Sequence, residues 1–210
     1  MKIYPKFIAW LIGAWFLFSL TAAAFHLWRT RQGQPPLAFG IAAVAPIVAF
    51  MIWYRVSAGF RKFLHSLNPR TLTWVQTWRV EALVFLVLAE YGILPYLFAL
   101  PAGLGDIAVG ATAPLMAMKL ADRNRRKGFI RWQLFGMLDL VTAVTLGTLA
   151  RFINPHGVPT DAMTMLPLSL IPTFAVPLMF ILHFICIVQA RRWPAQRPSR
   201  MMEPLRQPAQ

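Results

Sequence analysis

The sequence predicts an all-α membrane protein: a polytopic bundle of six transmembrane helices with both termini in the cytoplasm. Three observations predict this fold class. Of the 210 residues, 58% are hydrophobic and 13% are charged, with a mean hydropathy of +0.55, whereas a soluble domain carries about 25% charged residues. The apolar residues fall into six runs near the length of about 20 residues that a spanning helix requires. When these runs are threaded through a bilayer, all but three of the 21 Lys and Arg residues lie on one side.

The six spans follow in order along the chain. We expect them at residues 7–28, 37–54, 73–94, 101–120, 130–150 and 166–189. Together they form a single transmembrane bundle over residues 1–190, which leaves no length for a soluble domain. The first run follows a basic segment and ends in small residues, as a secretory signal peptide does, but its length is that of a span. We therefore expect an uncleaved first helix; cleavage would leave five spans.

Two segments outside the spans also have interpretable patterns. Over residues 57–67, apolar side chains recur at helical spacing and basic side chains occupy the opposite face, up to the Asn68-Pro69 pair that ends the segment. This pattern predicts an interfacial helix whose basic face meets lipid phosphates. The tail at 191–210 holds four prolines and five arginines and little that can be buried. We expect it to be disordered, with its arginines near anionic lipid.

The distribution of basic residues sets the orientation. The three exceptions on the opposite side are Arg29, Arg31 and Arg151. By the positive-inside rule both termini face the cytoplasm, as in a protein of the bacterial inner membrane. The expected partners are the lipid bilayer, anionic headgroups at the cytoplasmic face and an unknown small molecule or ion. Nucleic acid is not expected, because the basic residues form short blocks between apolar runs. Arg79 and Glu81 are interpreted as anchors at the cytoplasmic edge of the third span.

Four ionisable residues lie deeper in the predicted spans. A charged group at membrane depth costs about 2.5–3.5 kcal/mol on insertion scales, so each one is a candidate for a substrate- or ion-binding site. The four candidates are Glu90, Asp106, Asp139 and His183. Asp139 is the strongest, because it falls near the centre of the fifth span on a face with small residues that lets another helix approach.

The other three candidates have competing structural explanations. Asp106 follows a Pro- and Gly-rich stretch and would act as the N-cap of a short fourth helix with a broken entrance. Glu90 must find a partner on another helix, remain protonated or meet a water-filled cavity. A lone His183 among apolar residues is more often a packing residue than a ligand. Haem ligation by His183 and His26 is disfavoured, because the two histidines differ in depth.

No motif assigns a reaction. The sequence lacks the spacings of a zinc site, a serine-hydrolase elbow or a phosphate-binding loop, so we expect no metal, no cofactor and no assigned catalytic residue. The single cysteine, Cys186, excludes a disulfide within the chain. The leading hypothesis is a small proton-coupled carrier or channel-like protein lined by buried carboxylates.

Two alternatives belong to other classes. An integral membrane enzyme acting on a lipid or isoprenoid would use Glu90 or Asp139 with His183 as acid and base, and would bring a carboxylate within about 3.2 Å of the histidine, directly or through one water. A non-catalytic subunit or assembly factor would pair its acids only with arginines or backbone, in a core without a cavity beside Asp139.

Overall fold

The computed structural model describes residues 3–29, 37–119, 121, 125–154 and 156–193. In this part of the chain, six helices are long and apolar enough to span a membrane, as predicted. The helical elements are α1 (Ile3–Ala24), α2 (Leu37–Val56), α3 (Ala58–Ser66), α4 (Pro69–Val75), η1 (Gln76–Ala82), α5 (Leu83–Glu90), α6 (Tyr96–Lys119), α7 (Arg126–Ile153), η3 (Asp161–Thr164), η4 (Ile171–Ala175) and α8 (Val176–Arg191). Of the expected tail, residues 194–210 lie outside the described residues.

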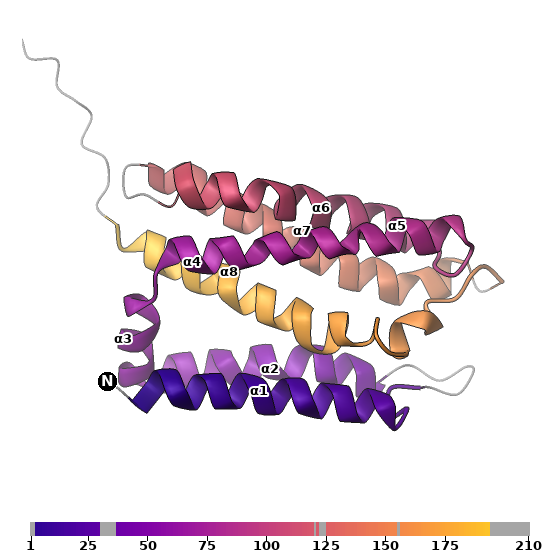
Figure 1. The fold of residues 1–210 in the computed structure, drawn as a ribbon, viewed down its shortest axis with the longest axis horizontal. Helices are drawn as coiled ribbons and strands as arrows, with labels where there is room; N and C mark the ends of the chain where they lie inside the picture. Colours follow the sequence, from indigo (N-terminus) through magenta and orange to yellow (C-terminus); the bar gives the residue numbers. More distant parts are fainter. Residues whose placement is uncertain (1–2, 30–36, 120, 122–124, 155, 194–210) are drawn as a thin grey trace, which may run out of the picture.

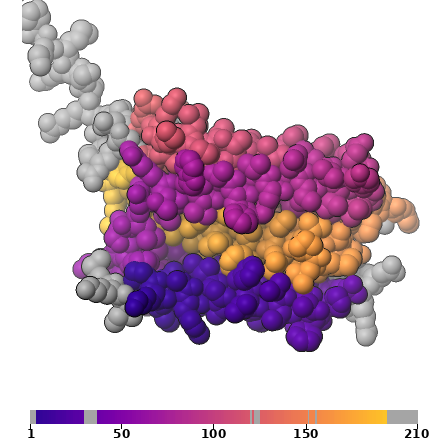
Figure 2. Space-filling view, in the orientation of Figure 1, coloured from indigo at the N-terminus to yellow at the C-terminus, as the bar shows by residue number. Residues whose placement is uncertain are grey.

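The helices form a four-part core with a pair of helices at its side. One continuous rod, α4–η1–α5, packs against α6, α6 packs against α7, and α7 packs against α8. Figure 1 shows α1 and α2 along the other side of α8, and in Figure 2 the surface of α8 is visible between α1 and the α4–α5 rod. After six crossings, the start of α1 and the end of α8 lie at the same end of the bundle, together with α3 (Figure 1).

The third span begins earlier than the sequence pattern predicted. The interfacial helix ends directly before Asn68 and Pro69, as expected, since α3 ends at Ser66. The same pair also begins the next helix: the Asn68 Oδ1 accepts a hydrogen bond from the Arg70 N–H at 2.9 Å, and Pro69 occupies the first turn. Proline fits there because its missing N–H has no partner in the first turn. The apolar span is therefore Pro69–Glu90 rather than residues 73–94, and Arg79 lies at its middle.

The fourth span is a continuous helix, so the broken entrance expected before Asp106 is wrong. Helix α6 already begins at Tyr96 and includes Pro101 and Pro114. Its glycines are explained by close packing: a Cβ at Gly110 would lie 2.7 Å from the backbone nitrogen of Val80 in η1. Asp106 is therefore an interior helical residue facing the core, and it does not cap the helix.

The last span is irregular where proline interrupts it. Residues Ile171–Ala175 form a π-helical turn before α8. Pro177 lacks the N–H that would bond the Thr173 carbonyl in an α-helix, and this carbonyl instead accepts from Trp15 Nε1 at 3.2 Å and Ser19 Oγ at 3.4 Å. The interruption at η4 thereby leaves the Thr173 carbonyl free to accept from α1, which helps to hold α1 against the core.

Candidate functional site

A buried arginine lies at the centre of the bundle. Arg79 is only 4% exposed and comes from η1, half-way along the third span. Its interpretation as a cytoplasmic anchor is wrong, because the span begins at Pro69 and carries Arg79 well inside. A guanidinium stays protonated in proteins and presents five N–H donors, so at this depth it requires acceptors from neighbouring helices.

Two carboxylates supply the acceptors. Arg79 Nε lies 2.5 Å from Asp106 Oδ1 on α6, and Arg79 Nη2 is ion-paired with Asp139 Oδ2 on α7. The aspartate side chains are 10% and 8% exposed. Three spans are thus joined through a single side chain, and both ion pairs in the described part of the chain belong to this arginine. We call Arg79, Asp106, Asp139 and His183 the Arg79 cluster.

The third nitrogen of the guanidinium defines the state of His183. Arg79 Nη1 donates to the Gly136 carbonyl at 3.2 Å and lies 3.0 Å from His183 Nε2. Since the guanidinium can only donate, Nε2 is the acceptor and the imidazole is neutral with its proton on Nδ1. This Nδ1–H then donates to Gln133 Oε1 at 2.5 Å.

The hydrogen-bond chain continues towards the basic end of the bundle. Gln133 Nε2 donates to Thr73 Oγ1 at 3.1 Å, and the Thr73 hydroxyl donates to the Pro69 carbonyl at 2.8 Å. Gln133, Thr73 and His183 are all 0% exposed. In this series of hydrogen bonds, His183 Nδ1, Gln133 Nε2 and Thr73 Oγ1 each donate to an acceptor. These contacts fix the orientation of the His183 ring and the Gln133 amide.

Glycines allow the helices to approach closely enough for these contacts. A Cβ on Gly105 of α6 would overlap the Asp139 carboxylate, and a Cβ on Gly136 of α7 would overlap the His183 ring. Both positions therefore exclude any side chain while the cluster is in place. The small-residue face predicted around Asp139 thus receives the functional groups of the neighbouring helices.

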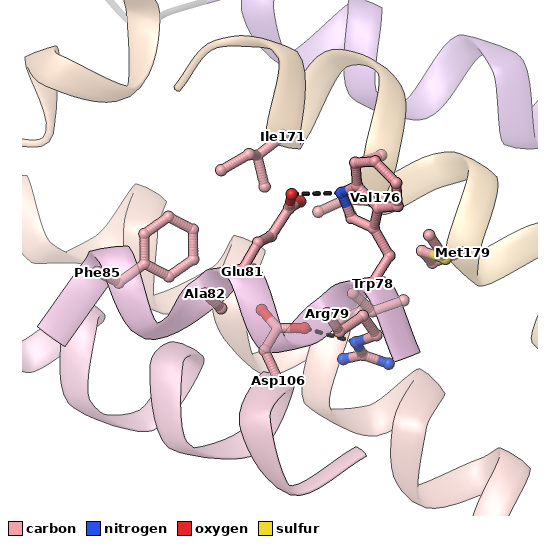
Figure 3. A pocket seen from close by; sticks show the side chains of 11 residues that line it. Trp78, Arg79, Glu81, Ala82, Phe85, Asp106, Ile171, Val176 and Met179 are labelled. Atoms are coloured by element: carbon pink, nitrogen blue, oxygen red, sulfur yellow. Dashed lines mark hydrogen bonds and ion pairs between the residues drawn. The ribbon is translucent and has the colours of Figure 1, made fainter. Parts of the chain in front are cut away.

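A small cavity adjoins the cluster. Its volume is about 20 Å³, close to the space that one water molecule requires. Figure 3 shows Arg79 and Asp106 on one side and Glu81, hydrogen-bonded by Trp78 Nε1, on the other. Glu81 is exposed on the outside of the bundle, but it lies two residues after Arg79 near the middle of the Pro69–Glu90 span, so its interpretation as an anchor at the edge of the span is also wrong. The cavity lies between this outward-facing carboxylate and a carboxylate in the core.

The structure brings together three of the four residues predicted from sequence. Asp106, Asp139 and His183 surround Arg79, whereas Glu90 lies exposed at the end of α5 and accepts from the Tyr96 hydroxyl at 2.9 Å. Glu90 does not join the Arg79 cluster, because the third span ends at this residue. A ligand role for any of the four remains a prediction.

Sequence reasoning missed Arg79 and Gln133. The signal for Arg79 was a lone cation inside an apolar run, which became visible only once the start of the helix was placed correctly. Gln133 is an uncharged residue and gave no comparable signal. Within the described residues, no three His, Cys, Asp or Glu side chains are grouped as a metal ion would require.

Comparison with known proteins identifies the family. Residues 36–191 match the family described as "Domain of unknown function (DUF8737)". The chain belongs to this family. The matched region runs from just before α2 to the end of α8, so it includes every residue of the Arg79 cluster and leaves α1 outside. No curated protein and no solved structure matched the chain.

Proposed function

We propose that this chain is a small multi-pass protein of the bacterial inner membrane, with cytoplasmic termini, that carries out proton-coupled transport through the Arg79 cluster. The six membrane-capable helices are compatible with a multi-pass membrane protein. The basic residues near the start of α1, around α3, between α6 and α7 and after the end of α8 favour a cytoplasmic location for that end of the bundle.

The observation that carries the proposal is the charge balance of the cluster. Two carboxylates, Asp106 and Asp139, share the single positive charge of Arg79, and His183 is neutral in this hydrogen-bond arrangement. When both acids are ionised, the buried cluster carries one uncompensated negative charge, which is costly away from water. Binding one proton between the two aspartates removes this charge, as in other carboxylate pairs that share a proton.

The cavity offers one step of a proton path inside the span. A water molecule that entered this small space would link Glu81, on the membrane-facing surface, with the buried Asp106. Arg79 then links Asp106 to Asp139, so a change of protonation at one acid alters the charge that the guanidinium must balance at the other. Movement of Arg79 between the two acids would couple protonation to the packing of η1, α6 and α7.

Infrared difference spectroscopy of the purified protein tests the proton site directly. On a pH jump, the wild type should show one protonated-carboxyl band that disappears in both Asp139→Asn and Asp106→Asn, because removing either acid leaves one carboxylate balanced by Arg79. Glu90→Gln is the matched control, since it removes an exposed carboxylate outside the cluster and should leave the band in place. A band that persists in both aspartate variants would refute the proposal.

Proteoliposomes then test transport. A pH-sensitive dye trapped inside reports proton entry when a potassium diffusion potential is imposed. We expect uptake by the wild type and by Glu90→Gln, and loss of uptake in Asp139→Asn. If wild-type liposomes take up protons no faster than protein-free ones, the channel-like form of the proposal is wrong, and substrate-dependent uptake must be found for the carrier form to stand.

A second candidate is a non-catalytic membrane subunit or assembly factor. The observation that favours it is that both buried aspartates are paired with Arg79, as a purely structural ion network would be. This reading predicts no proton exchange in the infrared experiment. The membrane-enzyme hypothesis has less support, because the hydrogen-bond partners of His183 in the described residues are Arg79 and Gln133 rather than a carboxylate.

A further inference from the structure

A basic pocket lies outside the Arg79 cluster, at the end of the bundle that carries α3. It has a volume of about 450 Å³ and opens between α3 and the end of α8. The residues that line this basic pocket are Ala58, Arg61, Lys62, His65, Ser66 and Arg192. None of these described lining residues is acidic, so the cations of Arg61, Lys62 and Arg192 share the pocket without a carboxylate from the described part of the chain.

The walls of the basic pocket are fixed by the packing of α3. Ser57 caps this helix by accepting from the Phe60 N–H at 3.2 Å, and Phe60, Phe63 and Leu64 are buried on its inner face. Gln189 of α8 donates through Nε2 to the Leu64 carbonyl at 2.7 Å and to the Leu67 carbonyl at 2.9 Å. Because α8 satisfies the last carbonyls of α3, these hydrogen bonds fix the position of α3 relative to the end of α8, and these two elements form the sides of the pocket.

Two of the side chains that line the basic pocket have features that bear on anion binding. Arg61 Nη1 donates to the Tyr54 carbonyl at 2.9 Å and to the Arg55 carbonyl at 2.6 Å, which anchors the guanidinium at the rim. His65 Nε2 is shielded from solvent and has no hydrogen-bond partner among the described residues. A buried polar nitrogen without a partner is unfavourable. Because Nε2 is shielded, the ring must turn towards the pocket for a phosphate oxygen to become its partner.

We propose that the basic pocket binds the phosphate of an anionic phospholipid headgroup from the leaflet at this end of the bundle. Phosphate is the anion that clustered Arg and Lys side chains recognise best. A lipid is favoured over free phosphate because α2, which ends two residues before the lining residue Ala58, carries exposed apolar side chains: Val56 and Ile52 are 79% and 58% exposed. Acyl chains can lie along this surface while the headgroup occupies the hollow. The inference depends on membrane insertion but not on the proton site.

Lipid titration with a charge-matched pair of variants tests the assignment. The pocket variant, Lys62→Gln with Arg192→Gln, removes two lining cations; the control, Lys127→Gln with Arg191→Gln, removes two exposed cations outside the pocket. Delipidated protein in neutral detergent is titrated with phosphatidylglycerol or cardiolipin, and retained lipid is counted by native mass spectrometry. We expect the pocket variant to bind about 10- to 30-fold more weakly, as the loss of two near-surface cations predicts, and the control to remain within about two-fold of the wild type.

Three further measurements make the result decisive. Melting of the lipid-free variants should match the wild type, since Lys62 and Arg192 are exposed. Phosphatidylcholine should bind equally weakly to all forms, and inorganic phosphate should not displace the anionic lipid at equal concentration. Equal weakening of both double variants would mean diffuse attraction rather than a site, and displacement by inorganic phosphate would mean a free-phosphate site; either result overturns the proposal.

Discussion

Replacing Arg79 by methionine should destabilise the protein strongly. Methionine has a similar reach and no charge, so Arg79→Met leaves the Asp106 and Asp139 carboxylates buried without a partner; their side chains are 10% and 8% exposed. Removing one partner of a buried ion pair costs about 3–5 kcal/mol. For a chain of this size, such a loss lowers the melting temperature by about 6–20 °C.

A compensating variant separates charge from packing. Combining Arg79→Met with Asp106→Asn and Asp139→Asn removes all three charges, and buried ion networks replaced by neutral groups often lose little stability. We therefore expect the triple variant to regain at least half of the stability lost by the single one, because the three sites are coupled. Arg70→Met, at an exposed arginine, is the control and should stay within about 0.5 kcal/mol of the wild type.

The assay is thermal unfolding in a mild detergent at constant protein-to-detergent ratio, followed by far-ultraviolet circular dichroism. Two results would refute the reasoning. One is an Arg79→Met variant that loses less than about 1 kcal/mol, the value of a solvent-exposed pair. The other is a triple variant less stable than the single variant, since then the uncompensated carboxylates are not the source of the loss.

Two further predictions concern close packing and pH. Gly136→Ala places a methyl group against the His183 ring and should lower the free energy of unfolding by about 1–3 kcal/mol. Gly40→Ala is the control and should be neutral in the same melting assay, because nothing lies within 4 Å of the added carbon. Equal effects of the two substitutions would contradict the packing argument. Burial, reinforced by the charge of Arg192, holds the pKa of His65 below 6.5, so the folded state favours the neutral ring. The contribution of His65 to the stability of the folded state is therefore complete above pH 6.5 and is lost as pH falls through the lowered pKa. A plot of melting temperature against pH should show this loss in the wild type and a smaller loss in His65→Gln. Anionic phospholipid should reduce the loss in the wild type, because a bound phosphate offsets the repulsion between protonated His65 and the cations of the basic pocket. Identical curves for the wild type and His65→Gln would exclude a role for His65.

Helix starts were harder to predict than helix existence. The Asn68-Pro69 pair predicted the end of one helix, and the structure shows that it also begins the next, with Asn68 capping the Arg70 N–H. The consequence was large: when the span starts at Pro69, Arg79 lies near the middle of the span instead of at its edge. The prolines of α6 had a similar effect, because packing against η1 keeps the helix continuous where local propensity predicted a break.

The buried acids were found from sequence because charge is rare and costly in apolar runs, and this holds for Asp106 and Asp139 whatever their partners. The sequence by itself determined six apolar helices, an amphipathic segment at 57–67 and the segregation of basic residues, since each depends on composition and period within a single segment. The tertiary structure alone decided which acids meet, because a contact among η1, α6, α7 and α8 depends on the rotation and depth of four helices at once. Small residues such as Gly136 permit that approach, but they do not specify which side chain fills the space.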